Sequence, residues 1–327
     1  MNSTRERLIN TAERLPPGWL SPILDTPFRQ GSVDADGCAI NFFEWGKRGA
    51  RPLVLLHGFL AHAGCWAAIA PLLAGDHHVV AYDLSGMGDS GARKAYTYAV
   101  RVAELIVVTE HTGQFGQCAK PIIIAHSFGG TVALSALEQH SAAFGGTIIC
   151  DLMALRPERL AKHFSGSRPP GSQDPDRPQK IYRDYETARA RYVLSPPQEV
   201  GVPYLVDYMA YHSLRQVEGG WSWKFDPGVF RRDDKSQDMW EWQGKRIVEA
   251  PGRKAVIHGE QSLLFDADSA AYLRELGGTD FPIIAIPQAK HHLMLDQPIA
   301  LAAALRSILQ TWAADDGNLA MKDGKKL

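Results

Sequence analysis

The sequence has little cysteine and no excess of charge of either sign. Its four cysteines lie far apart and form no CxxC pair, which argues against a disulfide framework or a zinc site; they are Cys38, Cys65, Cys118 and Cys150. The 35 lysines and arginines balance 36 acidic residues, so the charge does not favour nucleic acid or an anionic membrane as a partner. Small molecules are therefore the expected partners.

Long hydrophobic runs are also missing. No run approaches the roughly 18 to 20 apolar residues that span a bilayer. The first 20 residues hold no apolar stretch of signal-peptide length, so we expect a soluble protein in the reducing cytoplasm. The glycine-rich turn at residues 83–91 lacks the spacing and the lysine of a phosphate-binding loop, and we expect no cofactor.

What the sequence does contain is a regular alternation of short apolar runs and helical patterns. The apolar runs are at residues 39–43, 52–58, 78–83, 121–125, 147–151, 254–259 and 281–286, and the helical patterns are at 98–112, 129–139 and 298–312. Continuous β-branched runs are typical of parallel strands buried on both faces. Their alternation with helices predicts an α/β fold with a doubly wound, mostly parallel sheet.

The alternation stops between residues 152 and 250, where prolines and aromatic residues are frequent. We interpret this segment as a helical lid inserted into a core made of residues 33–151 and 251–312. Residues 1–32 are expected to form an N-terminal extension, and residues 313–327 a frayed polar tail. Trp221, Trp223 and Tyr208 are candidate substrate contacts in the lid. The alternative is that these rings form the core of a small subdomain.

Ser127 is the candidate nucleophile. It follows the apolar run at 121–125 directly and precedes a helical pattern that starts with two glycines. Ala125-His126-Ser127-Phe128-Gly129 differs from the G-x-S-x-G elbow only in its first residue. The backbone N–H of Phe128 would form half of an oxyanion hole. The alternative is a serine that merely caps the helix.

Four motifs in order resemble the lid-bearing α/β-hydrolase superfamily: His57-Gly58-Phe59, the turn at 83–90, the elbow at 125–130 and the segment at 291–298. The resemblance covers about residues 33–312 and implies the α/β-hydrolase fold. It also implies that Phe59 supplies the second oxyanion N–H. The base would be His291, seven residues before Pro298, with His292 as the second choice.

The acid departs from the usual pattern of the superfamily. Its usual position, after the penultimate strand, corresponds to Ser262, which cannot carry a negative charge. Asp151 ends the strand that follows the nucleophile helix, and zearalenone lactonases and some haloalkane dehalogenases look similar in placing their acid there. We favour Asp151 and keep Glu260 as the alternative acid. Asp151 could instead cap a helix.

These residues predict a serine hydrolase that cleaves an ester or lactone of a hydrophobic small molecule through an acyl-enzyme on Ser127. Serine in place of a carboxylate nucleophile argues against dehalogenase and epoxide-hydrolase chemistry. Two other functions stay open: a lyase of the hydroxynitrile-lyase type, and a lactone-binding receptor that retains the triad. No metal is expected, and the sequence leaves a homodimer open.

Overall fold

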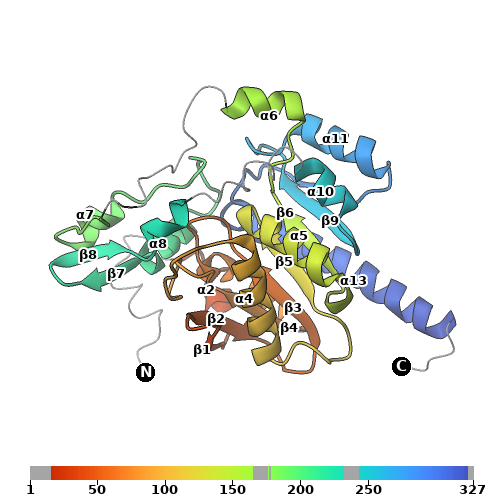
Figure 1. The fold of residues 1–327 in the computed structure, drawn as a ribbon, viewed down its shortest axis with the longest axis horizontal. Helices are drawn as coiled ribbons and strands as arrows, with labels where there is room; N and C mark the ends of the chain where they lie inside the picture. The colour runs from red at the N-terminus through yellow and green to blue at the C-terminus, as the bar shows by residue number, and fades with distance from the viewer. Residues whose placement is uncertain (1–15, 165–175, 177, 232–242, 323–327) are drawn as a thin grey trace.

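A computed structural model describes residues 16–164, 176, 178–231 and 243–322 of the chain. Its centre is an eight-stranded sheet (Figure 1). The strands are β1 (Arg29–Asp34), β2 (Ala39–Trp45), β3 (Arg51–Leu56), β4 (His77–Tyr82), β5 (Ile122–His126), β6 (Gly146–Cys150), β9 (Lys254–Gly259) and β10 (Ile283–Ile286). They lie in the order β1-β2-β4-β3-β5-β6-β9-β10. β2 is antiparallel to both β1 and β4, and all other neighbours are parallel. The predicted fold class is confirmed.

The helical segments connect these strands and cover the sheet. They are α2 (Ser21–Leu24), η1 (Ala63–Trp66), α3 (Ala70–Leu73), α4 (Tyr98–His111), α5 (Phe128–His140), η2 (Ser141–Ala143), α6 (Pro157–Phe164), α7 (Tyr185–Arg189), α8 (Pro203–His212), η3 (Pro227–Phe230), α10 (Gln243–Glu249), α11 (Ala267–Gly277), α12 (Leu293–Asp296) and α13 (Pro298–Lys322). None of the helices within the described residues combines the length and the apolarity that crossing a bilayer would require.

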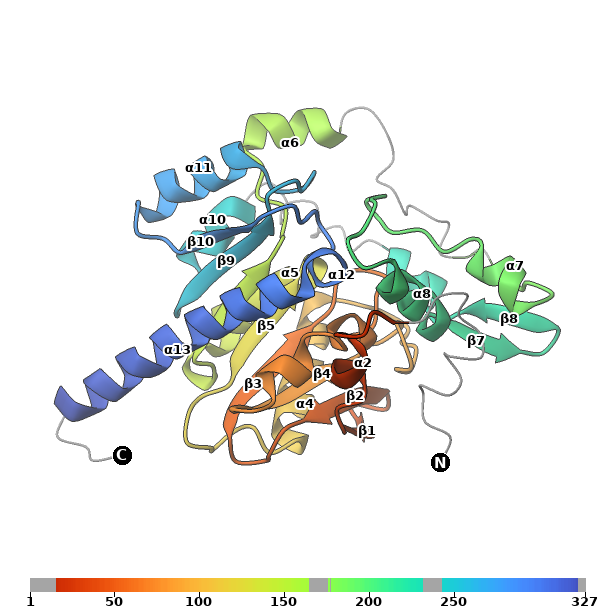
Figure 2. The same ribbon diagram turned by 180° about the vertical axis from the view of Figure 1, so that it is seen from behind.

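The buried strands serve two cores, one on each face of the sheet. Leu53 and Leu55 of β3 pack on the side of α13, whereas Val54 and Leu56 pack on the side of α4 and α5. Successive side chains of a strand point to opposite faces, so a strand covered on both sides is apolar throughout. Helices α4 and α5 lie before the sheet in Figure 1, and α13 lies before it in the reverse view of Figure 2.

The ends of the chain differ from the prediction. β1 begins at Arg29, inside the expected extension, and Leu20 is fully buried. β1 is an edge strand with mostly exposed residues, so it lacks the apolar pattern of a buried strand. The frayed tail predicted from residue 313 is wrong for residues 313–322, because α13 continues to Lys322. Arg253 holds this extension, with Nη1 donating to Trp312 O at 3.1 Å and Nη2 lying 2.9 Å from Asp316 Oδ1.

The segment at 152–250 contains α6, α7 and α8, and also an antiparallel hairpin of β7 (Leu214–Val217) and β8 (Gly220–Trp223) that was not predicted. Its turn contains Gly219 at φ 83°, a conformation that glycine adopts readily. At the end of the segment, α10 packs against α11, and Ile247 is buried in a cluster with Leu134 and Val256 of the core. Residues 1–15, 165–175, 177, 232–242 and 323–327 of the predicted extension, lid and tail lie outside the described residues.

Candidate active site

Ser127 lies in a sharp turn between β5 and α5, with φ 50° and ψ −123°. This is a strained conformation for a residue with a side chain. The turn is held by two hydrogen bonds, from Ser127 N–H to Cys150 O at 2.9 Å and from Gly130 N–H to Ser127 O at 2.8 Å. A Cβ on Gly129 would lie 2.7 Å from His57 O, so the close packing of the turn against the end of β3 requires glycine. The strand–serine–helix turn expected from the sequence is present.

His291 and Asp151 form a direct contact. Asp151 follows β6 with φ 52° and is fully buried, and His291, 3% exposed, lies between β10 and α12. His291 Nδ1 is 2.8 Å from Asp151 Oδ1. The Asp151 N–H donates to Ile257 O of the adjacent β9 at 2.8 Å, which fixes the strand end that carries the carboxylate. The structure thus brings together two residues that are 140 positions apart.

Ser262, at the usual position of the acid, supports Asp151. Its hydroxyl donates to Asp151 Oδ1 at 2.7 Å, and the Gly259 N–H donates to Oδ2 at 2.8 Å. Ser262 Oγ also accepts the N–H of Leu264 at 3.1 Å, which orients the hydroxyl. Hydrogen bonds of this kind offset the cost of burying a carboxylate. The sequence revealed the missing charge at position 262 but not this hydrogen bond, which only the approach of two loops creates.

The second-choice residues have other contacts. Glu260 is exposed, and its Oε2 accepts the N–H of Gln288 at 3.0 Å. His292 donates its backbone N–H to Gln198 Oε1 at 3.0 Å. Burial, together with the charge of His291, lowers the pKa of His292 to about 3, so this ring stays neutral near pH 7. Neither residue shares the contact that joins His291 to Asp151.

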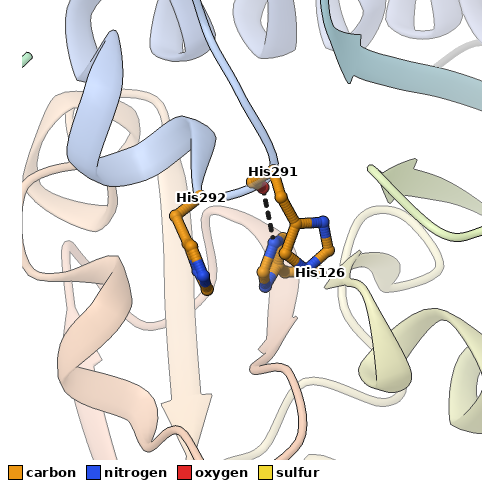
Figure 3. A group of neighbouring side chains, drawn as sticks. All are labelled: His126, His291 and His292. Carbon is orange, nitrogen blue, oxygen red and sulfur yellow. Dashed lines mark hydrogen bonds between the residues drawn. The ribbon is translucent and has the colours of Figure 1, made fainter. Parts of the chain in front are cut away.

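His126 connects the nucleophile turn to the candidate base. It directly precedes Ser127, and its Nε2 donates to His291 O at 3.0 Å (Figure 3). The rings of His126 and His291 lie 4.7 Å apart between centroids. Burial, reinforced by the charges of His291 and His292, holds the pKa of His126 well below its ordinary value. Sequence reasoning assigned no role to His126.

The two expected oxyanion donors lie at the start of α5 and in the loop after β3. Phe128 opens α5, so its N–H precedes the first intrahelical hydrogen bond and faces outward from the helix start. Phe59 follows Gly58 after β3, and the two phenyl rings meet edge to face at 5.5 Å. Phe230 packs on Phe59 at 5.6 Å. Phe59, Phe128 and Phe230 together form what we call the aromatic wall.

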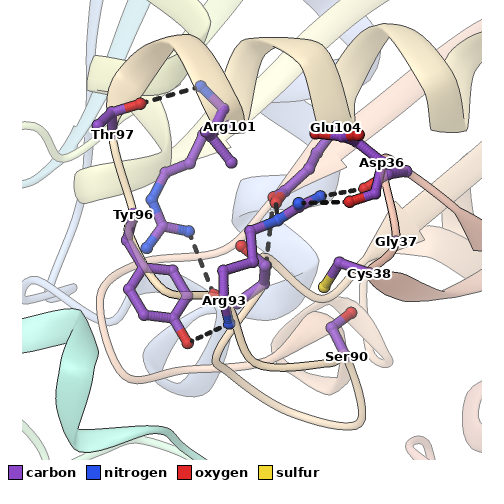
Figure 4. A network of polar contacts seen from close by, with 12 residues as sticks. Asp36, Gly37, Cys38, Ser90, Arg93, Tyr96, Thr97, Arg101 and Glu104 are labelled. Carbon is purple, nitrogen blue, oxygen red and sulfur yellow. Dashed lines mark hydrogen bonds and ion pairs between the residues drawn. The ribbon is translucent and has the colours of Figure 1, made fainter.

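A buried cation, Arg101, contacts one ring of this wall. Figure 4 shows Arg101 beside Tyr96. Arg101 of α4 is 1% exposed, and its guanidinium carbon is 5.2 Å from the centre of the Phe128 ring. Such a contact is favourable because the face of the ring is negative. Beside it, the Tyr96 hydroxyl donates to Asp226, which precedes η3 in the segment between the hairpin and residue 231. This contact joins that segment to the core next to the nucleophile turn.

The candidate lid contacts lie elsewhere. Tyr208 and Trp221 line a cavity of about 530 Å³, which we call the lid cavity, between the hairpin and the loops after β3 and β4. Among the described residues that line it, neither Ser127 nor His291 appears. Trp223 packs against Tyr182 with a centroid separation of 6.1 Å. A role of these three aromatic residues in substrate binding stays a prediction.

Sequence comparison identifies relatives of this chain. The profile of the alpha/beta hydrolase family matches residues 53–304. A serine hydrolase-like protein of Danio rerio is 29% identical over 204 residues, which cover 58% of this chain and 57% of that protein. A hydrolase of Bacillus subtilis is 29% identical over 126 residues, covering 38% of this chain and 44% of that protein. The chain thus spans less than two thirds of the length of these curated relatives.

Solved structures with the same fold cover most of the chain. E-2-(acetamidomethylene)succinate hydrolase has a TM-score of 0.68 and 15% identity, covering 87% of this chain and 100% of that one. An esterase of Mycobacterium tuberculosis has a TM-score of 0.66 and 17% identity, covering 91% of this chain and 99% of that one. The family profile extends from β3 into α13, and the sheet has the strand arrangement described above. The chain therefore belongs to the alpha/beta hydrolase family.

Proposed function

We propose that the protein hydrolyses a carboxylic ester or lactone of a hydrophobic small molecule through an acyl-enzyme on Ser127. The observation that carries this proposal is the 2.8 Å contact between His291 and a buried Asp151, beside a serine held in a strained strand–helix turn. A serine hydroxyl is a weak nucleophile unless a positioned base removes its proton. A histidine oriented by a carboxylate is the usual device for this.

In the proposed mechanism, His291 accepts the proton of Ser127 Oγ as the oxygen attacks the carbonyl carbon. The N–H groups of Phe59 and Phe128 bind the negative oxygen that develops. His291 then protonates the departing alkoxide, and a water molecule attacks the acyl-enzyme by the same route. Asp151 stays ionised and stabilises the imidazolium that forms twice in each cycle.

Asp151 is the proposed acid because its contacts suit a permanent negative charge. Three donors converge on its carboxylate: His291 and Ser262 on Oδ1, and the Gly259 N–H on Oδ2. Glu260 instead accepts the N–H of Gln288 at an exposed turn. A buried carboxylate with three donors is preorganised, so it needs little reorganisation when the imidazole becomes charged.

The aromatic wall is the feature that supports a substrate with an apolar acyl group. Phe59 carries a proposed oxyanion donor on its backbone, yet its side chain is 39% exposed. A large exposed ring next to the reacting carbonyl can bury the apolar part of a substrate. Relatives include a protein named monoacylglycerol lipase in Xenopus laevis, 30% identical over 115 residues that cover 34% of each chain. That name is consistent with a hydrophobic ester.

Labelling and burst kinetics test the proposal. A fluorophosphonate probe should label the protein at Ser127, and a p-nitrophenyl ester should give a burst of product followed by steady turnover. A lyase would release an aldehyde with no burst, and a receptor would give on the order of one turnover per chain. If the probe labels no serine, the nucleophile assignment is wrong.

A further inference from the structure

Three imidazoles converge beside the nucleophile turn. His126 comes from the end of β5, and His291 and His292 come from the loop between β10 and α12 (Figure 3). One ring nitrogen from each lies within 4.8 Å of the others. The centroids of His291 and His292 are 4.9 Å apart. Adjacent histidines alone point in different directions, but the third ring, 165 positions away, completes a cluster.

We propose that this histidine cluster binds a divalent transition-metal ion of the Zn²⁺ class and that the bound ion inhibits the hydrolase. The inhibitory part rests on the proposed role of His291 as the base, whereas the binding part does not. Neutral imidazole nitrogens suit zinc, copper and nickel, and they suit magnesium and calcium poorly because those ions prefer oxygen ligands.

The surroundings of His291 match those of a metal-bound histidine. Its Nδ1 is held by Asp151, which leaves Nε2 as the nitrogen available to an ion. Histidines that bind metals commonly place their second ring nitrogen on a carboxylate, which fixes the ring and raises its basicity. Ser262 and Gly259 hold that carboxylate in turn. The orientation that a metal ligand needs is therefore already built for one of the three rings.

Only a small adjustment is needed to close the cluster. Nitrogen ligands lie about 2.0 to 2.1 Å from zinc, so those of a tetrahedral site are about 3.4 Å apart. Side-chain rotations would have to shorten the widest separation by up to about 1.4 Å. The Nε2 atom of His292 is buried and has no hydrogen-bond partner among the described residues, so its lone pair is available to an ion.

Three protein ligands leave a fourth position on the ion for water. The bound ion prevents His291 from acting as the base, because an ion on Nε2 occupies the lone pair that would receive the proton of Ser127. Binding therefore competes with the first step of the proposed mechanism. Removal of the ion with a chelator restores that lone pair, so the inhibition is reversible.

Calorimetry on the untagged full-length chain tests the binding, with Zn²⁺ as the probe and Mg²⁺ as the ion control. We expect one Zn²⁺ per chain and no heat from Mg²⁺. The key variant is His292→Gln, and His140→Gln is its matched control because His140 is exposed at the end of α5. His292→Gln should weaken Zn²⁺ binding by at least tenfold, and His140→Gln should leave it unchanged.

The carboxylate that holds His291 gives a second test of Zn²⁺ binding. Asp151→Asn should weaken Zn²⁺ binding by roughly 10- to 100-fold, as loss of the outer partner of a metal-bound histidine does. If His292→Gln does not fold, the visible spectrum of Co²⁺ bound to the unaltered chain replaces it, since a tetrahedral nitrogen site absorbs strongly. Equal Zn²⁺ affinity in His292→Gln and His140→Gln, or a weak octahedral Co²⁺ spectrum, would overturn the proposal.

An activity measurement separates this inference from the proposed function. Each variant's ester hydrolysis is compared with and without Zn²⁺, relative to its own metal-free rate. Loss of activity at one equivalent, restored by a chelator, supports both parts. Stoichiometric binding without any esterase activity leaves the site standing and refutes the proposed function. Full esterase activity with one Zn²⁺ bound, or activity that increases with Zn²⁺, refutes the inhibitory part.

Discussion

The candidate active site and the lid cavity are built in different ways. The site collects residues from the ends of β5 and β6 and the loop after β10, and its carboxylate is fully buried under three donors. The lid cavity is lined by α2, β2, the loops after β3 and β4, α8 and the hairpin. Parallel strands bring their carboxyl ends to one edge of the sheet, so the site follows from the fold. The lid cavity depends on how a small subdomain happens to pack.

The largest effect is expected at the nucleophile. Ser127→Ala removes the attacking oxygen and should lower kcat by roughly 10⁶-fold, as in other serine triads. Steady-state hydrolysis of a p-nitrophenyl ester measures the loss, and fluorophosphonate labelling should disappear with it. Ser141→Ala, at the other end of α5, should keep both readouts. Labelling that persists in Ser127→Ala would assign the nucleophile to another residue.

The choice of acid gives the next largest effect. Asp151→Asn should lower kcat by roughly 10⁴-fold because an amide cannot stabilise the imidazolium. Glu260→Gln, its matched control, should stay within about twofold, since it alters only an exposed hydrogen bond to Gln288. The ratio of kcat values decides between the two acids. The opposite ranking would show that the buried pair of His291 and Asp151 is structural.

Moving the carboxylate from position 151 to position 262 is a more stringent test of the acid assignment. Ser262 Oγ lies 2.7 Å from Asp151 Oδ1, the oxygen that His291 contacts, so a carboxylate at either position can reach the same imidazole. The double variant Asp151→Ser with Ser262→Asp should recover at least tenfold in kcat over Asp151→Ser alone. No recovery in a double variant that unfolds at the same temperature as Asp151→Ser would show that position 262 cannot support the base.

Ser262 itself should have an intermediate effect. Its hydroxyl donates to a charged group, and such a hydrogen bond is worth about 1.5 to 3 kcal/mol. Ser262→Ala should therefore lower kcat by about 10- to 100-fold. KM should hardly change, because Ser262 acts through Asp151. Ser262→Thr keeps the hydroxyl and should restore most of the rate. Equal losses in Ala and Thr variants, or a loss confined to KM, would contradict a positioning role.

The contrast between the candidate active site and the lid cavity also explains which features could be predicted from the sequence. The strands and the turn that holds Ser127 could be predicted, because a buried parallel strand is apolar throughout and the elbow motif is local. The contact between His291 and Asp151 followed from a family resemblance and a strand end. The Ser262 hydrogen bond and the approach of His126 were not readable, because they depend on the tertiary packing of loops. The hairpin was missed because its partner strands are short and carry polar residues.

The aromatic wall and the lid cavity are two alternative binding sites for the acyl chain of the substrate. Phe59→Ala keeps the backbone N–H but removes an exposed ring, so kcat/KM for an octanoate ester should fall roughly tenfold while the acetate ester changes little. Trp221→Ala should alter both esters by less than about threefold, because Trp221 lines the lid cavity, whose described lining includes neither Ser127 nor His291. A larger chain-length effect in Trp221→Ala would place the acyl chain in the lid cavity.

The smallest effect concerns the stability of the lid cavity in acid. Burial, together with the charges of His62 and Lys224, lowers the pKa of His212 from its ordinary 6.5 to about 3. Between these values the unfolded chain binds a proton that the folded chain does not, so stability is complete above pH 6.5 and falls as the pH drops. His212→Phe removes this proton uptake. Its unfolding free energy should fall less between pH 7 and pH 5 than that of the unaltered chain, by about 1 to 2 kcal/mol.

Thermal unfolding followed by circular dichroism at the two pH values measures this difference. His140→Gln is again the control, because His140 is exposed at the end of α5 and is not among the described residues that line the lid cavity. His57 and His292 also have pKa values lowered to about 3, but they are present in both proteins, so their contributions cancel in the comparison. If the unaltered chain and His212→Phe lose the same stability on acidification, His212 must be solvated, and the lid cavity is then an open cleft that water fills.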